Sequence, residues 1–236
     1  MEMKTKKMEG KKAKVEKDNQ KPKNLAFDTL LEEARRNEIK AKMQKNIELI
    51  EAVKKRDKKK ISELIMAGAD PTKRDILGGY PDEAIIIAKK TQDYEMLTLI
   101  TNKIIEYFET KGNVEEKEEK DKLNKVLIIA SDMFLPLEKI KRLVELGAKP
   151  DSQYKDFENG QSAFIKCAIK GNIVAANYFK DYIKNISHED RDGKTAMMHA
   201  MAHRHDDIRW LIFEEMEKRR KSPPREIEEE LIIPDD

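Results

Sequence analysis

The chain has 236 residues, of which 40% are charged and only 6% are aromatic. Its 48 basic and 46 acidic residues leave a formal net charge of +2, which argues against a protein that binds nucleic acid over its whole surface. The single cysteine excludes an intramolecular disulfide, no apolar run reaches about 18 residues, and no apolar region follows the basic start at residues 1–7. We therefore expect a cytoplasmic protein with neither a signal peptide nor a membrane-spanning helix.

The N-terminal segment, residues 1–24, contains nine lysines and no aromatic residue. Because it offers too little apolar surface to offset the entropy of ordering, we predict a disordered basic tail. Apolar residues then recur at helical spacing from Leu25, which predicts a helix within residues 25–45 that caps the folded part of the chain.

Helix pairs with a turn signal at their end follow along the chain. In the first, Gly68 supplies a left-handed residue and Pro71 prevents the helix from continuing; Gly147 and Pro150 repeat that arrangement. We expect five repeats, separated by one charged insertion and followed by a charged tail. Their ranges are 46–71, 72–108, 123–150, 151–186 and 187–218, with the insertion at 109–122, as a loop or a helix extension, and the tail at 219–236.

The fourth and fifth repeats carry the clearest periodicity. Gly160 and Gly193 stand 33 residues apart, and residues 160–168 match residues 193–201 position by position. A period of this length is typical of stacked repeat proteins. No segment alternates apolar and polar residues with a period of two, so we predict an all-α fold of stacked helix-turn-helix repeats.

These repeats resemble the ankyrin repeat. Asp190, Gly193 and Thr195 fall on the Asp, Gly and Thr of that family's pattern, and Ala200 and His205 fall on its first Ala and second His. The fourth repeat departs from the pattern at Ala163 and Ile165, and the fifth at Ala196 and Met198, where the family has Pro and His. The resemblance covers about residues 46–218 and implies an α-solenoid whose function is to bind another protein.

In ankyrin-like proteins the partner is commonly held by the turn tips and by the two residues after the Ala pair, on the concave face. Carried over to this chain, the concave-face positions are Lys54, Lys55, Lys89, Lys90, Ile169, Lys170, Ala202 and His203. The turn-tip positions are Arg74, Asp75, Glu158, Asn159, Gln161, Arg191, Asp192 and Lys194.

Five lysines and a histidine at the concave positions would form a positive stripe that attracts an acidic segment of a partner protein. The alternative is that these lysines only complement the dipoles of their helices. Nucleic acid is disfavoured as a partner because aromatic residues do not interleave with the lysines. We expect a monomer.

Other chemistry has weaker support. His199 and His203 share one helix face at the spacing of a zinc pair, which leaves a metal-dependent enzyme as an alternative, but neither a nearby cysteine nor an H-E-x-x-H pattern supports it. Cys167 lies on an Ala position and predicts a buried apolar role. Trp210 predicts packing in the core or on the capping face, with a role as an anchor for a partner as the alternative. We expect no metal, no cofactor and no catalytic residue.

The end of the chain suggests another alternative. Residues 226–230 are rich in glutamate and precede Leu231, Ile232 and Ile233, a pattern similar to the C-terminal secretion signals of effectors from intracellular bacteria. Such a protein would be translocated into a host cell and would use its repeats to bind a host protein there.

Overall fold

The computed structural model describes residues 25–73, 83–112 and 116–221, with side chains from residue 32 onward. Within these ranges the chain forms α-helices and one 3-10 turn, with a single isolated β-bridge between Glu189 and Thr195 and no strand. The predicted all-α fold is confirmed. The predicted basic tail at 1–24 and the proposed secretion signal at 226–233 lie outside the described residues.

Two compact units divide the chain, residues 1–40 and residues 41–236. Helix α1 (Leu25–Lys54) belongs to both, so the helix expected at 25–45 runs without a break into the first helix of the first repeat. In the first unit, residues 32–40 are all exposed. In the second unit, Leu49 and Val53 at the end of α1 are buried and begin the core.

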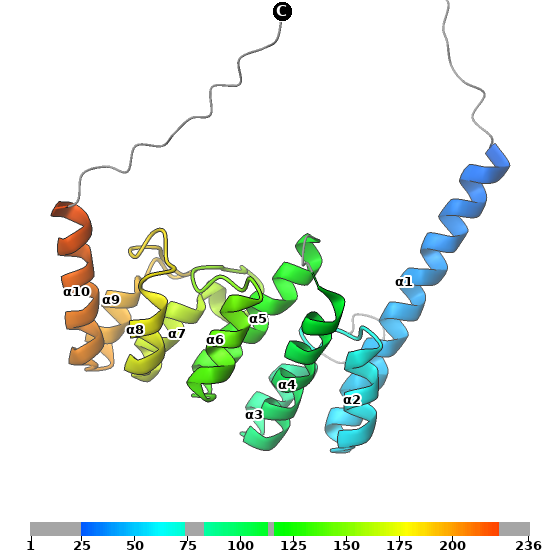
Figure 1. Ribbon diagram of the computed structural model, residues 1–236, viewed down its shortest axis with the longest axis horizontal. Helices are drawn as coiled ribbons and strands as arrows, with labels where there is room; N and C mark the ends of the chain where they lie inside the picture. The colour runs from blue at the N-terminus through cyan, green and yellow to red at the C-terminus, as the bar shows by residue number, and fades with distance from the viewer. Residues whose placement is uncertain (1–24, 74–82, 113–115, 222–236) are drawn as a thin grey trace, which may run out of the picture. The chain divides into compact units, whose positions relative to one another are not determined.

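The second unit is a series of helix pairs (Figure 1). After α1 come α2 (Lys58–Met66), α3 (Ala84–Lys90), α4 (Tyr94–Lys111), α5 (Lys117–Asp132), α6 (Leu137–Glu145), α7 (Ala163–Lys170), α8 (Ile173–Phe179), α9 (Ala196–Ala202) and α10 (Asp206–Lys221), with the 3-10 turn η1 (Glu158–Gly160) before α7.

The helices of this unit form two layers. The first helices of successive pairs pack in the order α3, α5, α7 and α9, and the second helices pack in the order α2, α4, α6, α8 and α10. Small residues such as Ala163, Ala168 and Ala200 are fully buried and let neighbouring first helices approach closely. The core therefore runs along the stack, between the two layers, and each pair depends on its neighbours for burial.

The two turn signals read from the sequence act in the same way. Gly68 and Gly147 have φ angles of 91° and 103°, and each directly follows the end of a second helix. The carbonyls of Pro71 and Pro150 then accept hydrogen bonds from Ile85 N and Phe164 N, at 3.0 and 3.1 Å. These bonds anchor the start of the next first helix, so the same four residues end one repeat and orient the next.

The charged insertion at 109–122 consists largely of helix extensions, because α4 continues to Lys111 and α5 begins at Lys117. Lys122 is 3% exposed; its Nζ lies 3.7 Å from Glu119 Oε1 and 4.9 Å from the centre of the Tyr107 ring. The sequence allowed a loop or a helix extension at 109–122, and the described residues of this segment support the helix extension.

Candidate functional site

The predicted concave-face residues lie at the C-terminal ends of the first helices. One backbone hydrogen bond recurs at each end, and it aligns the repeats: Asp57 N to Ala52 O, Asp93 N to Ala88 O, Leu135 N to Ala130 O, Asn172 N to Cys167 O and His205 N to Ala200 O. Each of these bonds closes the turn between a first helix and its second helix, so residues at equal distances from it occupy equivalent places.

This register changes the alignment of the second repeat by one residue. Lys89 is equivalent to Ala168, whereas Lys54, Lys90 and Ala202 are equivalent to Ile169. Lys89 therefore occupies a position that is buried in the fourth repeat, and only 21% of its side chain is exposed. In the third repeat the residue equivalent to Lys90 is Asp132, which places an acid in the middle of the predicted lysine row.

A group of five charged side chains surrounds this acid, and we call it the lysine–carboxylate cluster: Lys89, Asp132, Glu158, Lys166 and Lys170. Lys89 Nζ lies 2.8 Å from Asp132 Oδ2 and 2.5 Å from Glu158 Oε2. Lys166 Nζ lies 2.6 Å from Glu158 Oε2 and 3.9 Å from Asp132 Oδ1, and Lys170 Nζ lies 3.8 Å from the same Asp132 oxygen. The cluster joins α3, α5 and α7 through the turn η1.

The cluster is internally compensated. Burial opposes the charge of Glu158, but Lys166 and Lys89 outweigh it and hold the pKa of this carboxyl below its ordinary value. Burial likewise opposes the charge of Lys89, and its contacts with Asp132 and Glu158 together raise its pKa. Three lysines and two carboxylates leave one positive charge, and Lys170 is the exposed lysine of the three.

Sequence reasoning missed Asp132 and Lys166. Lys166 could have been found because it precedes Lys170 by four residues and so shares its helix face. Asp132 could be found only with the correct register of the third repeat. No glycine marks the end of the first helix in this repeat, because Met133 is the residue that follows Asp132 there.

The other concave-face residues remain at the surface. Lys54, Lys55 and Lys90 are exposed, and Lys55 Nζ lies 3.7 Å from Glu51 Oε2. Ala202 and His203 are exposed at the end of α9, and Ile169 is half-buried. Since the first helices pack side by side, their C-terminal ends lie along one edge of the layer, and the exposed lysines follow that edge.

The turn tips of the fourth and fifth repeats are tied together. Asn159 Nδ2 donates to Asp192 Oδ2 at 2.9 Å, and Arg191 N donates to Asn159 O at 3.2 Å. Gln161 Nε2 donates to Asp190 Oδ2 at 3.3 Å. Lys194 is exposed, whereas Glu158 belongs to the lysine–carboxylate cluster. Two predicted tip residues, Arg74 and Asp75, lie outside the described residues.

An open groove adjoins the cluster through Phe157, the neighbour of Glu158. Its volume is about 590 Å³, and its lining includes Lys73, Lys125, Tyr154 and Phe157. Lys125 Nζ lies 5.3 Å from the centres of both the Tyr154 and Phe157 rings. The groove combines aromatic surface with lysine ammonium groups and with the carboxylates of Glu83 and Asp156.

The histidines make contacts within the fold. His199 Nε2 lies 2.7 Å from Asp190 Oδ2, His188 Nε2 lies 2.7 Å from Ser162 Oγ, and His205 Nε2 lies 3.2 Å from Ile169 O. His203 is exposed, with its ring centre 6.3 Å from that of His199. Over the described ranges, the structure brings together no group of three or more His, Cys, Asp or Glu side chains that could hold a metal ion.

Cys167 and Trp210 differ in how they match the sequence analysis. Cys167 is fully buried, as its Ala position predicts, and burial raises the pKa of its thiol. Trp210 is 55% exposed, so it does not pack in the core, which is one of the two places predicted for it.

Comparison with known proteins identifies the repeats. The family model described as ankyrin repeats (3 copies) matches residues 127–222, which span the third, fourth and fifth helix pairs. No curated protein matches the chain. None of the helices in the described residues is both long and apolar enough to cross a membrane.

Proposed function

We propose that this chain, in which residues 127–222 match the ankyrin repeat model, binds an acidic segment of a partner protein along the concave face of its repeat stack. Ankyrin repeats are protein–protein interaction modules and are generally not enzymes, so a binding role needs no catalytic site. The proposal goes beyond that general role in two respects, which are the face that binds and the negative charge of the partner.

The observation that carries the proposal is the row of exposed lysines at equivalent helix ends. Lys54, Lys55, Lys90 and Lys170 are exposed along one edge. Glu51 lies beside Lys55, while Asp132 and Glu158 are already paired with lysines of the cluster. The surface that a partner meets is therefore positive, and the acids that would repel an acidic segment are compensated from within.

This arrangement favours docking without rearrangement of the repeats. The cluster fixes the spacing of α3, α5 and α7, so the exposed lysines sit on a preformed surface. At moderate salt, exposed charges attract a partner over a distance of about 10 Å, and beyond that distance the dissolved ions screen them. Because more salt shortens this distance, we expect association to slow as the salt concentration rises.

Charge reversal at the four exposed lysines tests the proposal. The variant Lys54→Glu/Lys55→Glu/Lys90→Glu/Lys170→Glu keeps Lys89 and Lys166, the two less exposed lysines of the cluster, and removes from it only the longer contact of Lys170 with Asp132. A matched control reverses four other exposed lysines, Lys59, Lys117, Lys120 and Lys184, and changes the net charge equally. Affinity capture from the source cells with mass spectrometry should recover a partner with the wild type and the control.

The same capture should lose that partner with the four-lysine variant, while thermal unfolding shows that all three chains are folded. A partner retained by the four-lysine variant would refute the concave lysines as its docking site. A partner lost equally from the control would refute a localised surface and leave only a net-charge effect.

A further inference from the structure

The last helix pair, α9 and α10, exposes an unusual amount of apolar surface. Ten large hydrophobic side chains are exposed among the described residues, and five of them belong to this pair. They are Met198, Met201, Trp210, Phe213 and Met216, exposed by 53%, 58%, 55%, 47% and 38%. We call these five side chains the terminal face, because α10 is the last helix of the described stack (Figure 1).

Three members of the terminal face occupy positions that the preceding repeat buries. Counting back 33 residues, Met198 corresponds to Ile165, Met201 to Ala168 and Met216 to Ile183, and these are 0%, 0% and 4% exposed. Helix α9 packs on α7 and α10 packs on α8, which brings the last pair against the preceding one. In the last pair, Met198, Met201 and Met216 are therefore apolar like the buried residues between two repeats, but no further helix of the described stack packs against them.

The other two members are apolar where the preceding repeat is polar. Trp210 and Phe213 correspond to Asn177 and Lys180. Their rings meet edge to face, with centres 5.7 Å apart. A terminal repeat needs a polar outer side for solubility, and an exposed apolar patch on a soluble protein usually marks a binding surface.

We propose that the chain covers its own terminal face with the segment that follows α10, residues 226–233. This segment lies outside the described residues, and its sequence places Ile227, Leu231, Ile232 and Ile233 among acidic side chains. The proposal is independent of the concave face, since it concerns the end of the stack and an intramolecular contact.

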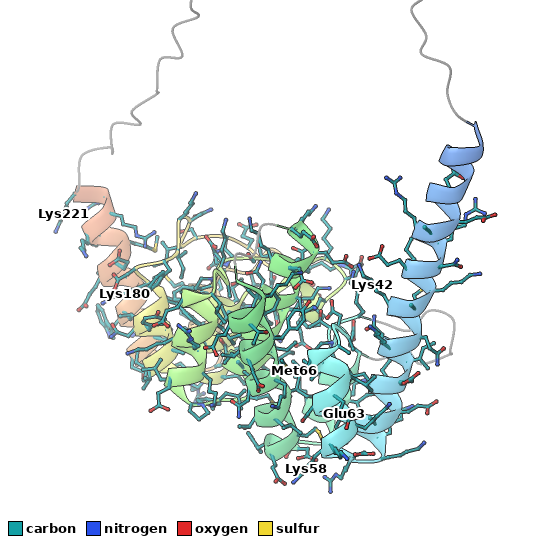
Figure 2. All side chains as sticks on the ribbon, turned by 45° about the vertical axis from the view of Figure 1, so that its right-hand side comes forward. Lys42, Lys58, Glu63, Met66, Lys180 and Lys221 are labelled. Atoms are coloured by element: carbon teal, nitrogen blue, oxygen red, sulfur yellow. The ribbon has the colours of Figure 1, made fainter. Side chains whose placement is uncertain are left out.

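The length of the connecting chain suits a return along α10. Lys221 closes α10 (Figure 2), and Pro223 and Pro224 follow it, where the helix cannot continue. Trp210 lies 11 residues before Lys221, which is about 16 Å along a helix. Five residues of extended chain from Glu226 to Leu231 also span about 16 Å. An extended segment running back from the end of α10 thus brings Leu231 level with Trp210.

The charges also match along this path. The last turn of α10 contains Lys218, Arg219, Arg220 and Lys221, and Glu215 and Glu217 of the same helix pair with the first three, so the turn keeps a surplus of positive charge. Residues 222–236 contain six acidic residues and one basic residue, and residues 226–230 would pass this basic turn first. Because the segment is tethered, its effective concentration is in the mM range, so even a contact with a dissociation constant of about 0.1 mM would be about nine-tenths formed.

Tryptophan fluorescence gives a direct test, because Trp210 is the only tryptophan of the chain. The test uses the full chain and the variant Leu231→Asp/Ile232→Asp/Ile233→Asp, with Leu231→Val/Ile232→Val/Ile233→Val as the matched control. We expect the aspartate variant to shift the emission of Trp210 to longer wavelength. Its acrylamide quenching should rise by up to about tenfold, since the accessible fraction would rise from about one-tenth to one. The valine control should keep the wild-type values.

Protein concentration separates the possible occupants. Cover by the chain's own segment is intramolecular, so quenching of the wild type should not change with dilution, and sedimentation should show one species. Equal quenching of the wild type and the aspartate variant would overturn the proposal. Quenching that falls as the protein is concentrated, together with a dimer in sedimentation, would also overturn it and assign the terminal face to a second copy.

Discussion

At the scale of single residues, Gly171 shows how one position can serve two helices. It ends α7 with φ +81°, and a β-carbon built on it would lie 2.7 Å from Cε1 of His205 at the start of α10. The ring of His205 approaches this closely because its Nε2 reaches Ile169 O. Glycine is therefore required here by its backbone conformation and by the close contact together.

We predict that Gly171→Ala lowers the free energy of unfolding by more than the left-handed conformation alone would cost, which is about 1–2 kcal/mol. Gly147→Ala is the matched control, since Gly147 also follows a helix with positive φ but has nothing within 4 Å of a β-carbon. Urea denaturation of both variants measures the difference. Equal losses would mean that contact with His205 adds nothing.

At the scale of helices, three of the second helices, α2, α4 and α8, begin with a polar side-chain cap. Asp57, Asp93 and Asn172 accept hydrogen bonds from the backbone N–H three residues later, at 3.0, 3.0 and 3.2 Å. Asp93 has an additional partner, because Arg56 Nη2 of the preceding repeat lies 2.8 Å from its Oδ2. The cap of α4 therefore also joins two adjacent repeats.

Substitutions at Asp93 separate these two contributions. We predict that Asp93→Ala destabilises the chain by about 1–2 kcal/mol, because α4 loses its cap. Asp93→Asn keeps an acceptor for Met96 N and loses only the ion pair with a largely exposed Arg56, which contributes about 0–1 kcal/mol. Chemical denaturation should therefore rank the alanine variant below the asparagine variant, and the reverse order would show that the ion pair dominates.

These helices were predictable where a local signal marks their ends. Gly68 with Pro71 and Gly147 with Pro150 identify two turns, and the 33-residue match identifies the fourth and fifth pairs. The second pair lacks such a mark at its end, so the alignment of Lys89 was one residue off. The extensions of α4 and α5 were ambiguous because a charged sequence is compatible with either a solvated loop or an exposed helix.

At the scale of the whole molecule, contacts between distant residues escape a reading of the sequence. Lys89, Asp132 and Lys166 come from three repeats, and only the packing of α3, α5 and α7 brings them together. The exposure of Met198 and Met201 is likewise a property of the end of the stack, since the equivalent Ile165 and Ala168 are fully buried. Local pattern predicts which residues form a repeat, whereas the neighbours of that repeat decide which of its side chains are buried.

The lysine–carboxylate cluster should make the stability of the stack depend on pH through Glu158. Its pKa in the folded chain is below the ordinary value of 4.5, because the effect of Lys166 and Lys89 exceeds that of burial. A carboxyl with a lowered pKa stabilises the fold fully above its unfolded pKa, and this stabilisation is lost as pH falls through the folded pKa. The loss should therefore begin below about pH 4.5.

We predict that Glu158→Gln costs about 1.5–3 kcal/mol at pH 7, the usual contribution of hydrogen bonds to charged groups. As pH falls below 4.5, the wild type loses the same contribution, so the two unfolding free energies should converge. Glu63→Gln on the exposed side of α2 is the control and should follow the wild type at every pH. Urea denaturation at several pH values checks this, and a difference between Glu158→Gln and wild type that stays constant down to pH 3 would contradict a stabilising charge on Glu158.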